Sequence, residues 1–82
     1  MIMEEIKEKV NTIFRQVFED PAITIHEEMT AKEVAKWDSL THLTMISDVE
    51  KVFGIKFKLK ELVGMKNVGD MLKLIENKTG AQ

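Results

Sequence analysis

Residues 37–54 read WDSLTHLTMISDVEKVFG. From Ser39 to Phe53 the apolar residues recur at helical spacing, and Gly54 suits the left-handed conformation that ends many helices. Asp38 or Ser39 would cap the start, because both side chains can accept a hydrogen bond from an unpaired N–H group of the first turn. We therefore predict a helix from Ser39 to Phe53.

This predicted helix has two faces when successive residues are placed about 100° apart. One arc holds the apolar side chains that we expect in the core, which are Leu43, Met45, Ile46, Val49, Val52 and Phe53. His42 falls in the middle of that arc, where we expect a half-buried packing histidine. The opposite arc should face outward and consists of Leu40, Thr41, Thr44, Ser47, Asp48 and Lys51.

Before this helix, the chain predicts one long helix and one long connection. Apolar residues from Ile2 to Val17 at spacings of four and three predict a helix over about 2–18, which Pro21 stops. The connection over 19–38 should be anchored to the core by Ile23, Ile25 and Met29. Thr30 and Glu33 can form a capping box for one helical turn that ends near Val34. A loop of this length in a small domain is uncommon and often functional.

After Gly54, the alternating run 55–60 resembles a strand but has no second strand to pair with. We expect an extended loop that places Ile55 and Phe57 in the core. A short helix should follow over about 59–63, closed by Gly64. The last helix should start at Asn67, which is its cap, and extend to about Lys78. It carries an apolar stripe of Val68, Met71, Leu72 and Ile75. The predicted fold is an all-α, small four-helix bundle (three main helices and one short) with a long first loop. It forms one domain over 1–82, ordered over about 2–78.

Composition narrows the class of protein. The 82 residues suffice for one domain, and without cysteine neither disulfides nor thiolate metal sites can support it. We also expect no metal-binding residues. We find no signal-peptide pattern and no membrane-spanning run, and expect a soluble, cytoplasmic monomer without membrane insertion. Lys56, Lys58 and Lys60 cluster without arginine or aromatic partners, which favours a solvated rim over nucleic-acid binding.

Ser39 is the residue with the most informative position. The start of a helix presents unpaired N–H groups and the positive end of the helix dipole, so a phosphate-linked group on this hydroxyl would be stabilised there. The simpler interpretation is that Ser39 or Asp38 only caps the helix. A serine hydrolase using His42 is a third interpretation, but Ser39 lacks the glycine-flanked turn of such nucleophiles.

Taken together, these motifs resemble an acyl carrier protein. The matching segments are Asp38-Ser39-Leu40, Val49-Glu50-Lys51-Val52-Phe53-Gly54-Ile55 and Asn67-Val68-Gly69-Asp70. The long first loop and the short third helix also fall where the family has them, and the likeness extends from about Ile2 to Lys78.

The resemblance implies a carrier rather than an enzyme. In the family, a phosphopantetheinyl transferase attaches phosphopantetheine from coenzyme A to the motif serine, here Ser39. The thiol of that arm holds acyl groups as thioesters for fatty-acid, lipid or polyketide-type biosynthesis. Asp38 would flank the phosphate and help the transferase engage. Leu40, Thr41, Thr44, Ser47, Asp48 and Lys51 would form the interface with this transferase and with acyl-loading and acyl-processing enzymes.

Several residues depart from the family pattern. The second helix is usually strongly acidic, whereas its outward arc here has Asp48 as its only acid. Trp37 and His42 replace the usual small residues near the serine. These differences favour a specialised free-standing carrier with less electrostatic docking. An aminoacyl or peptidyl carrier and a helical interaction module that is never modified are the alternatives.

Overall fold

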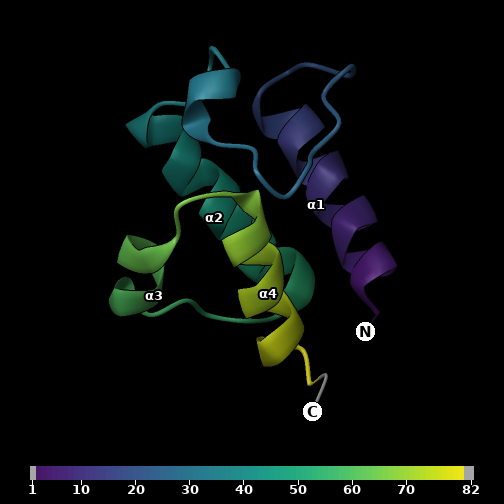
Figure 1. Ribbon diagram of the computed structural model, residues 1–82, viewed down its shortest axis with the longest axis vertical. Helices are drawn as coiled ribbons and strands as arrows, with labels where there is room; N and C mark the ends of the chain where they lie inside the picture. The colour runs from purple at the N-terminus through teal and green to yellow at the C-terminus, as the bar shows by residue number, and fades with distance from the viewer. Residues whose placement is uncertain (1, 81–82) are drawn as a thin grey trace.

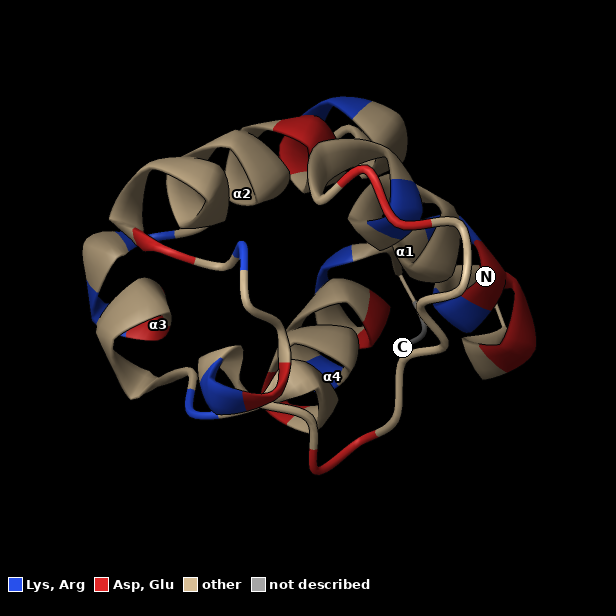
Figure 2. Ribbon diagram, turned by 90° about the horizontal axis from the view of Figure 1, so that it is seen from above, with Lys and Arg blue, Asp and Glu red and all other residues tan. Residues whose placement is uncertain are grey.

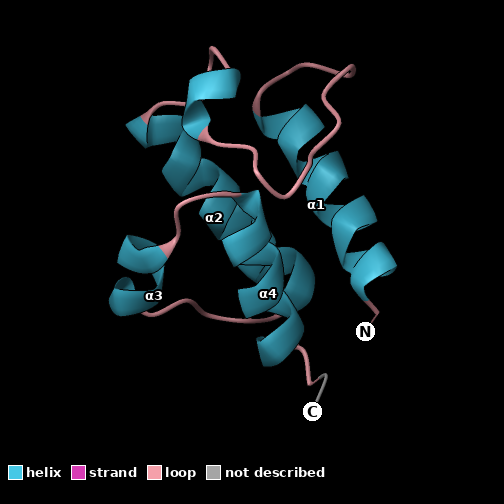
Figure 3. Cartoon of the chain, viewed as in Figure 1, coloured by secondary structure: helices cyan, strands magenta, loops and turns pink. Residues whose placement is uncertain are grey.

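The computed structural model describes residues 2–80 and is helical throughout its regular parts. Its elements are α1 (Met3–Val17), a single 3-10 turn (Ala31–Glu33), α2 (Ser39–Phe53), α3 (Leu59–Gly64) and α4 (Val68–Lys78). No strand occurs among these residues (Figure 3). The all-α prediction with three main helices and one short one is confirmed. The ends of the predicted domain, positions 1 and 81–82, lie outside the described residues.

The helix α1 lies at one side of the bundle and packs against both α2 and α4 (Figure 1). The short helix α3 lies on the far side of α4 from α1 (Figure 1). The long connection between α1 and α2 crosses one end of the bundle and brings the chain to the start of α2. Ser39 therefore stands at that end of the molecule.

The end of α1 differs slightly from the prediction. The helix ends at Val17, ahead of Pro21, because Glu19 adopts a left-handed conformation with φ 52°. The N–H groups of Glu19 and Asp20 then donate to the carbonyls of Gln16 (3.3 Å) and Arg15 (3.0 Å), which closes the helix with paired backbone groups.

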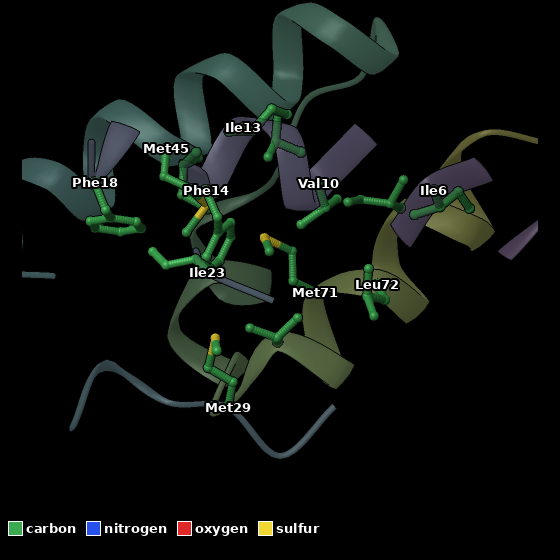
Figure 4. Packing of buried hydrophobic residues seen from close by; sticks show 14 residues of the cluster. Ile6, Val10, Ile13, Phe14, Phe18, Ile23, Met29, Met45, Met71 and Leu72 are labelled. Atoms are coloured by element: carbon green, nitrogen blue, oxygen red, sulfur yellow. The ribbon is translucent and has the colours of Figure 1, made fainter. Parts of the chain in front are cut away.

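One hydrophobic core joins the three main helices and the first loop. Its fourteen buried side chains are Ile6, Val10, Ile13, Phe14, Phe18, Ile23, Met29, Met45, Ile46, Val49, Val68, Met71, Leu72 and Ile75. Phe14, Met45 and Met71 converge near its centre (Figure 4). Ile23 and Met29 are buried as predicted, and Ile25, Ile55 and Phe57 are half-buried against this core.

The first loop is tied to the start of α4 by backbone hydrogen bonds. The N–H of Val68 donates to the carbonyl of Met29 (2.9 Å), and the N–H of Gly69 donates to that of Glu27 (2.8 Å). A Cβ atom on Gly69 would lie 3.0 Å from the same Glu27 oxygen. Glycine at position 69 therefore permits the loop to approach α4 closely.

The prediction for α2 was wrong at two positions. Leu43 and Val52 were expected in the core, but their side chains are 63% and 49% exposed. They are the two edges of the predicted apolar arc, at about 300° and 120° around the helix. Only the middle of the arc, which includes Met45, Ile46 and Val49, is buried, because α2 is covered along one narrow side. Gly54 has the predicted left-handed conformation, with φ 66°.

Candidate functional site

Ser39 is the first residue of α2, and its side chain is exposed. The helix that it opens has fifteen residues, so its first turn has N–H groups without partners inside the helix and a positive dipole end beside the serine. A phosphate attached to the Ser39 hydroxyl would lie close to both. The local structure therefore fits a covalently bound phosphate ester at this position.

Asp38 caps this helix together with Thr41. The Asp38 carboxylate accepts a hydrogen bond from the N–H of Thr41 (2.9 Å), and the Thr41 hydroxyl accepts one from the N–H of Asp38 (2.8 Å). These bonds form a capping box between Asp38 and Thr41. Asp38 is therefore the cap, and the Ser39 hydroxyl takes no part in these bonds. Hydrogen bonds from Thr41 lower the pKa of Asp38 below its ordinary value, because they favour the ionised carboxylate.

Trp37, the residue before the cap, is anchored in an aromatic cluster. Its ring meets Phe14 edge-on, with centroids 5.3 Å apart, and Phe18 at a tilt, with centroids 5.6 Å apart. Phe14 and Phe18 are themselves in edge contact at 5.5 Å. Both phenylalanines are fully buried, Phe14 in the last turn of α1 and Phe18 just beyond it. Trp37 therefore connects the end of the first loop, directly before Ser39, to the core.

His42 lies beside Trp37 and is half-buried, as predicted. The rings stack at 16° with centroids 5.9 Å apart, and Nε1 of Trp37 donates to Nδ1 of His42 at 3.0 Å. Because an indole N–H can only donate, Nδ1 must accept, which places the proton of neutral His42 on Nε2. Burial lowers the pKa of His42, so this neutral form is favoured. Nδ1 of His42 is thus hydrogen-bonded to the tryptophan and does not accept from Ser39. The hydrolase interpretation, in which His42 is the base for Ser39, gains no support from this atom.

Two spaces flank the Trp37–His42 pair. An open hollow of about 540 Å³ lies beside the serine and is lined by Ala31, Trp37, Asp38, Ser39, His42 and Leu43. A smaller cavity of about 130 Å³ extends inward, lined by Ala31, Trp37, His42, Met45, Met65, Lys66, Asn67, Val68 and Met71. The hollow beside the serine therefore adjoins a cavity that is lined in part by the core methionines Met45 and Met71.

The predicted outward arc of α2 is exposed at four of its six positions. Leu40 is 74% exposed, and Thr44, Ser47 and Lys51 are also exposed, whereas Thr41 and Asp48 are half-buried. Leu43, which sequence reasoning placed in the core, joins this surface next to the hollow. Its position at the edge of the apolar arc, one turn after Leu40, was the signal that could have identified it.

The charge around this surface is low. The ribbon of α2 is mostly uncharged (Figure 2), with Asp48, Glu50 and Lys51 as its only charged residues. Glu50 is engaged at the end of the helix, where its carboxylate accepts a hydrogen bond from the N–H of Phe57 (2.9 Å). No helix within residues 2–80 is long and apolar enough to cross a bilayer.

Comparison with known proteins agrees with this geometry. No family model matches the chain. An acyl carrier protein from Thermosynechococcus vestitus is 34% identical over 82 residues, which cover 99% of this chain and 100% of that protein. The solution NMR structure of a holo acyl carrier protein from Geobacter metallireducens superimposes with a TM-score of 0.85 at 40% identity, covering 90% of this chain and 85% of that one. One acyl carrier protein is similar to this chain over its full length, and the structure of another has the same helical fold. This chain therefore belongs to the acyl carrier protein family.

Proposed function

We propose that this protein carries acyl groups on phosphopantetheine attached to Ser39, for fatty-acid, lipid or polyketide-type biosynthesis. The observation that carries the proposal is the exposed Ser39 side chain at the first position of α2, beside an open hollow. When bound, phosphopantetheine supplies a thiol that holds acyl groups as thioesters. Tethering to Ser39 raises the effective concentration of the cargo at each enzyme, so the chain itself need not catalyse a reaction.

The residues around Ser39 support this role. The N–H groups and dipole of α2 would stabilise the phosphate ester. The Asp38 carboxylate, held by its hydrogen bond from the N–H of Thr41, is a fixed negative charge next to Ser39 for the transferase to engage. The capping box holds the start of α2 in one conformation, so Ser39 is presented in the same way to each partner.

Intact-protein mass spectrometry tests the attachment. The protein is measured before and after incubation with coenzyme A, magnesium ion and a broad-specificity phosphopantetheinyl transferase. We expect a gain of one phosphopantetheinyl group in the wild type and in Ser47→Ala, which removes the only other serine, and no gain in Ser39→Ala. Equal gain in Ser39→Ala would refute the assignment. The mass of cargo on protein isolated from its host then separates an acyl carrier from an aminoacyl carrier.

We further propose that partners dock on the outward face of α2, defined by Leu40, Leu43, Thr44, Ser47 and Lys51, with Thr41 and Asp48 at its margin. Both leucines are exposed: Leu43 lines the Ser39 hollow, and Leu40 directly follows Ser39 in the chain. Lys51 is the only lysine or arginine on the helix. A partner surface with an apolar contact and few charges fits this face better than a strongly basic one. We expect the transferase, the acyl-loading enzymes and the acyl-processing enzymes all to dock on this face.

The salt dependence of modification tests this docking mode. Contacts between exposed charges weaken as the ionic strength rises, whereas apolar contacts do not. We expect the kcat/KM of the transferase for this carrier to change little between low and high salt, and to fall about tenfold in Leu43→Asp. Val52→Asp, an equally drastic change at the other exposed edge of α2, is the matched control and should keep the wild-type rate. A steep loss of rate with salt in the wild type would contradict the proposal.

The carrier role also bears on where and how the protein works. The transferase and its donor, coenzyme A, must reach Ser39, and successive enzymes must then exchange the loaded carrier. We propose a single domain over 1–82 that acts in the cytoplasm as a monomer. Size-exclusion chromatography with light scattering tests the monomer, for which we expect a mass near 9.4 kDa before modification.

A further inference from the structure

The hollow beside Ser39 and the inner cavity share one wall. Three residues line both spaces, namely Ala31, Trp37 and His42. Ala31 contributes only a methyl group, so the two rings form most of the separation. The direct route from the hollow toward Met45 and Met71 therefore passes this pair.

The two rings differ in how firmly they are held. Trp37 packs on Phe14 and Phe18, so its ring cannot turn without disturbing the buried aromatic cluster. His42 is held to Trp37 by one ring stack and by the hydrogen bond from Nε1 to Nδ1 at 3.0 Å. Rotation of His42 about its side-chain bonds would break this bond and leave the indole N–H without its acceptor. His42 is thus the movable side of the wall, and Trp37 is the fixed side.

We propose that His42, closed against Trp37, decides whether an acyl chain carried on Ser39 stays in the outer hollow or enters the cavity. This inference rests on the proposed function, because it concerns the cargo of the modified serine. His42 is a positioning residue here, since it sets the location of the cargo and not its chemistry.

The size and lining of the cavity define the cargo that it can admit. Its volume of about 130 Å³ is close to that of an apolar cavity of about 150 Å³ that holds benzene. A chain of about six carbons therefore fills it, and the side chains of Met45, Met65 and Met71 offer deformable apolar contacts. With the pair closed, the wild-type protein keeps such a chain outside, exposed to the enzymes that act on it.

Methionine-methyl NMR on the loaded protein tests the proposal. The wild type, His42→Ala and His42→Gln are loaded with the transferase and hexanoyl-coenzyme A, and mass spectrometry establishes equal loading. The readout is the nuclear Overhauser contact between the terminal methyl of the hexanoyl group and the methyl groups of Met45 and Met71. Emission of Trp37, the only tryptophan in a chain without tyrosine, reports on the pair in the same samples.

Each variant has a distinct expected result. His42→Ala removes the movable side, so the ratio of inner to outer cargo should rise about fivefold, as expected when one hydrogen bond between uncharged groups no longer opposes entry. In His42→Gln, the amide oxygen of the new side chain can still accept from the indole, so this variant should behave as the wild type. His26→Ala, which alters the other histidine, on the first loop, is the matched control and should also leave the ratio unchanged.

Two results would overturn the inference. One is an equal set of methionine contacts in the wild type and in His42→Ala. The other, which does not depend on the folding of a variant, is a set of strong contacts to Met45 and Met71 in the hexanoyl-loaded wild type, relative to the acetyl-loaded wild type. Absence of loading on Ser39 in mass spectrometry would instead refute the proposed function, and the inference with it.

Discussion

The replacement Phe14→Leu should weaken the contact through which Trp37, at the end of the first loop, is anchored to the core. Phe14 is fully buried and makes two edge contacts, with Phe18 at 5.5 Å and with Trp37 at 5.3 Å. Each such contact is worth about 0.5–1.5 kcal/mol beyond burial, and leucine keeps most of the apolar volume. We therefore expect the free energy of unfolding to fall by about 2 kcal/mol, below the roughly 3–5 kcal/mol of a change to alanine.

The assay is thermal unfolding followed by circular dichroism and by Trp37 emission. A domain of 82 residues has a free energy of unfolding of roughly 4–12 kcal/mol, so the variant should still fold. The melting temperature should fall by roughly 8–16 °C, and the folded variant should emit at longer wavelength because Trp37 has lost a packing partner. Phe53→Leu, at a half-buried position that is in no aromatic pair within residues 2–80, is the control. A loss in Phe14→Leu no larger than in this control would refute the reasoning.

Three further changes test the backbone and the cap. Gly54→Ala should lower the free energy of unfolding by about 1 kcal/mol, because alanine is strained at φ 66° although nothing lies within 4 Å, whereas Gly64→Ala, also in open space but at an ordinary φ, should not destabilise the protein in urea unfolding. Gly69→Ala should cost about 1 kcal/mol and speed amide exchange at position 69, because its Cβ would lie 3.0 Å from the Glu27 oxygen; unchanged exchange would contradict the close approach. The pKa of Asp38 is lowered in the folded state, so its stabilisation is present above its unfolded pKa and is lost as the pH falls through the folded value. The urea midpoint of the wild type should therefore exceed that of Asp38→Asn at pH 6 and converge on it under strongly acidic conditions; a constant difference would count against this cap.

The helices were predicted well because the signals that start and end a helix lie within a few neighbouring residues. The bounds of α2 follow from Asp38 at its cap and Gly54 at its end, and both positions have the expected conformation. The cap of α4 by Asn67 was predicted in the same way, and its side chain accepts from the N–H of Asp70 at 2.9 Å. The end of α1 was harder to place, because a left-handed Glu19 leaves no mark of the kind that glycine leaves.

Burial on α2 was harder to predict, because periodicity shows which side chains share a face but not how wide the neighbouring helices are. Leu43 and Val52 are apolar and lie on the correct arc, yet the packing of α1 against α2 covers only its centre. The candidate site shows the same division. Ser39 was identified from its position at a helix start, whereas the pairing of Trp37 with His42 could not be read from their types.

The amino-acid order by itself determined the helices, their caps, the long first loop and the serine that opens α2, because these depend on interactions within a few residues. Only the tertiary structure decided that Trp37 packs on Phe14 and Phe18, residues about twenty positions away. It also decided that Trp37 and His42 are hydrogen-bonded to each other and line both the serine hollow and the methionine-lined cavity. Such features arise where separate segments meet, and their geometry is set by how α1, α2 and the loop that joins them fill the same volume.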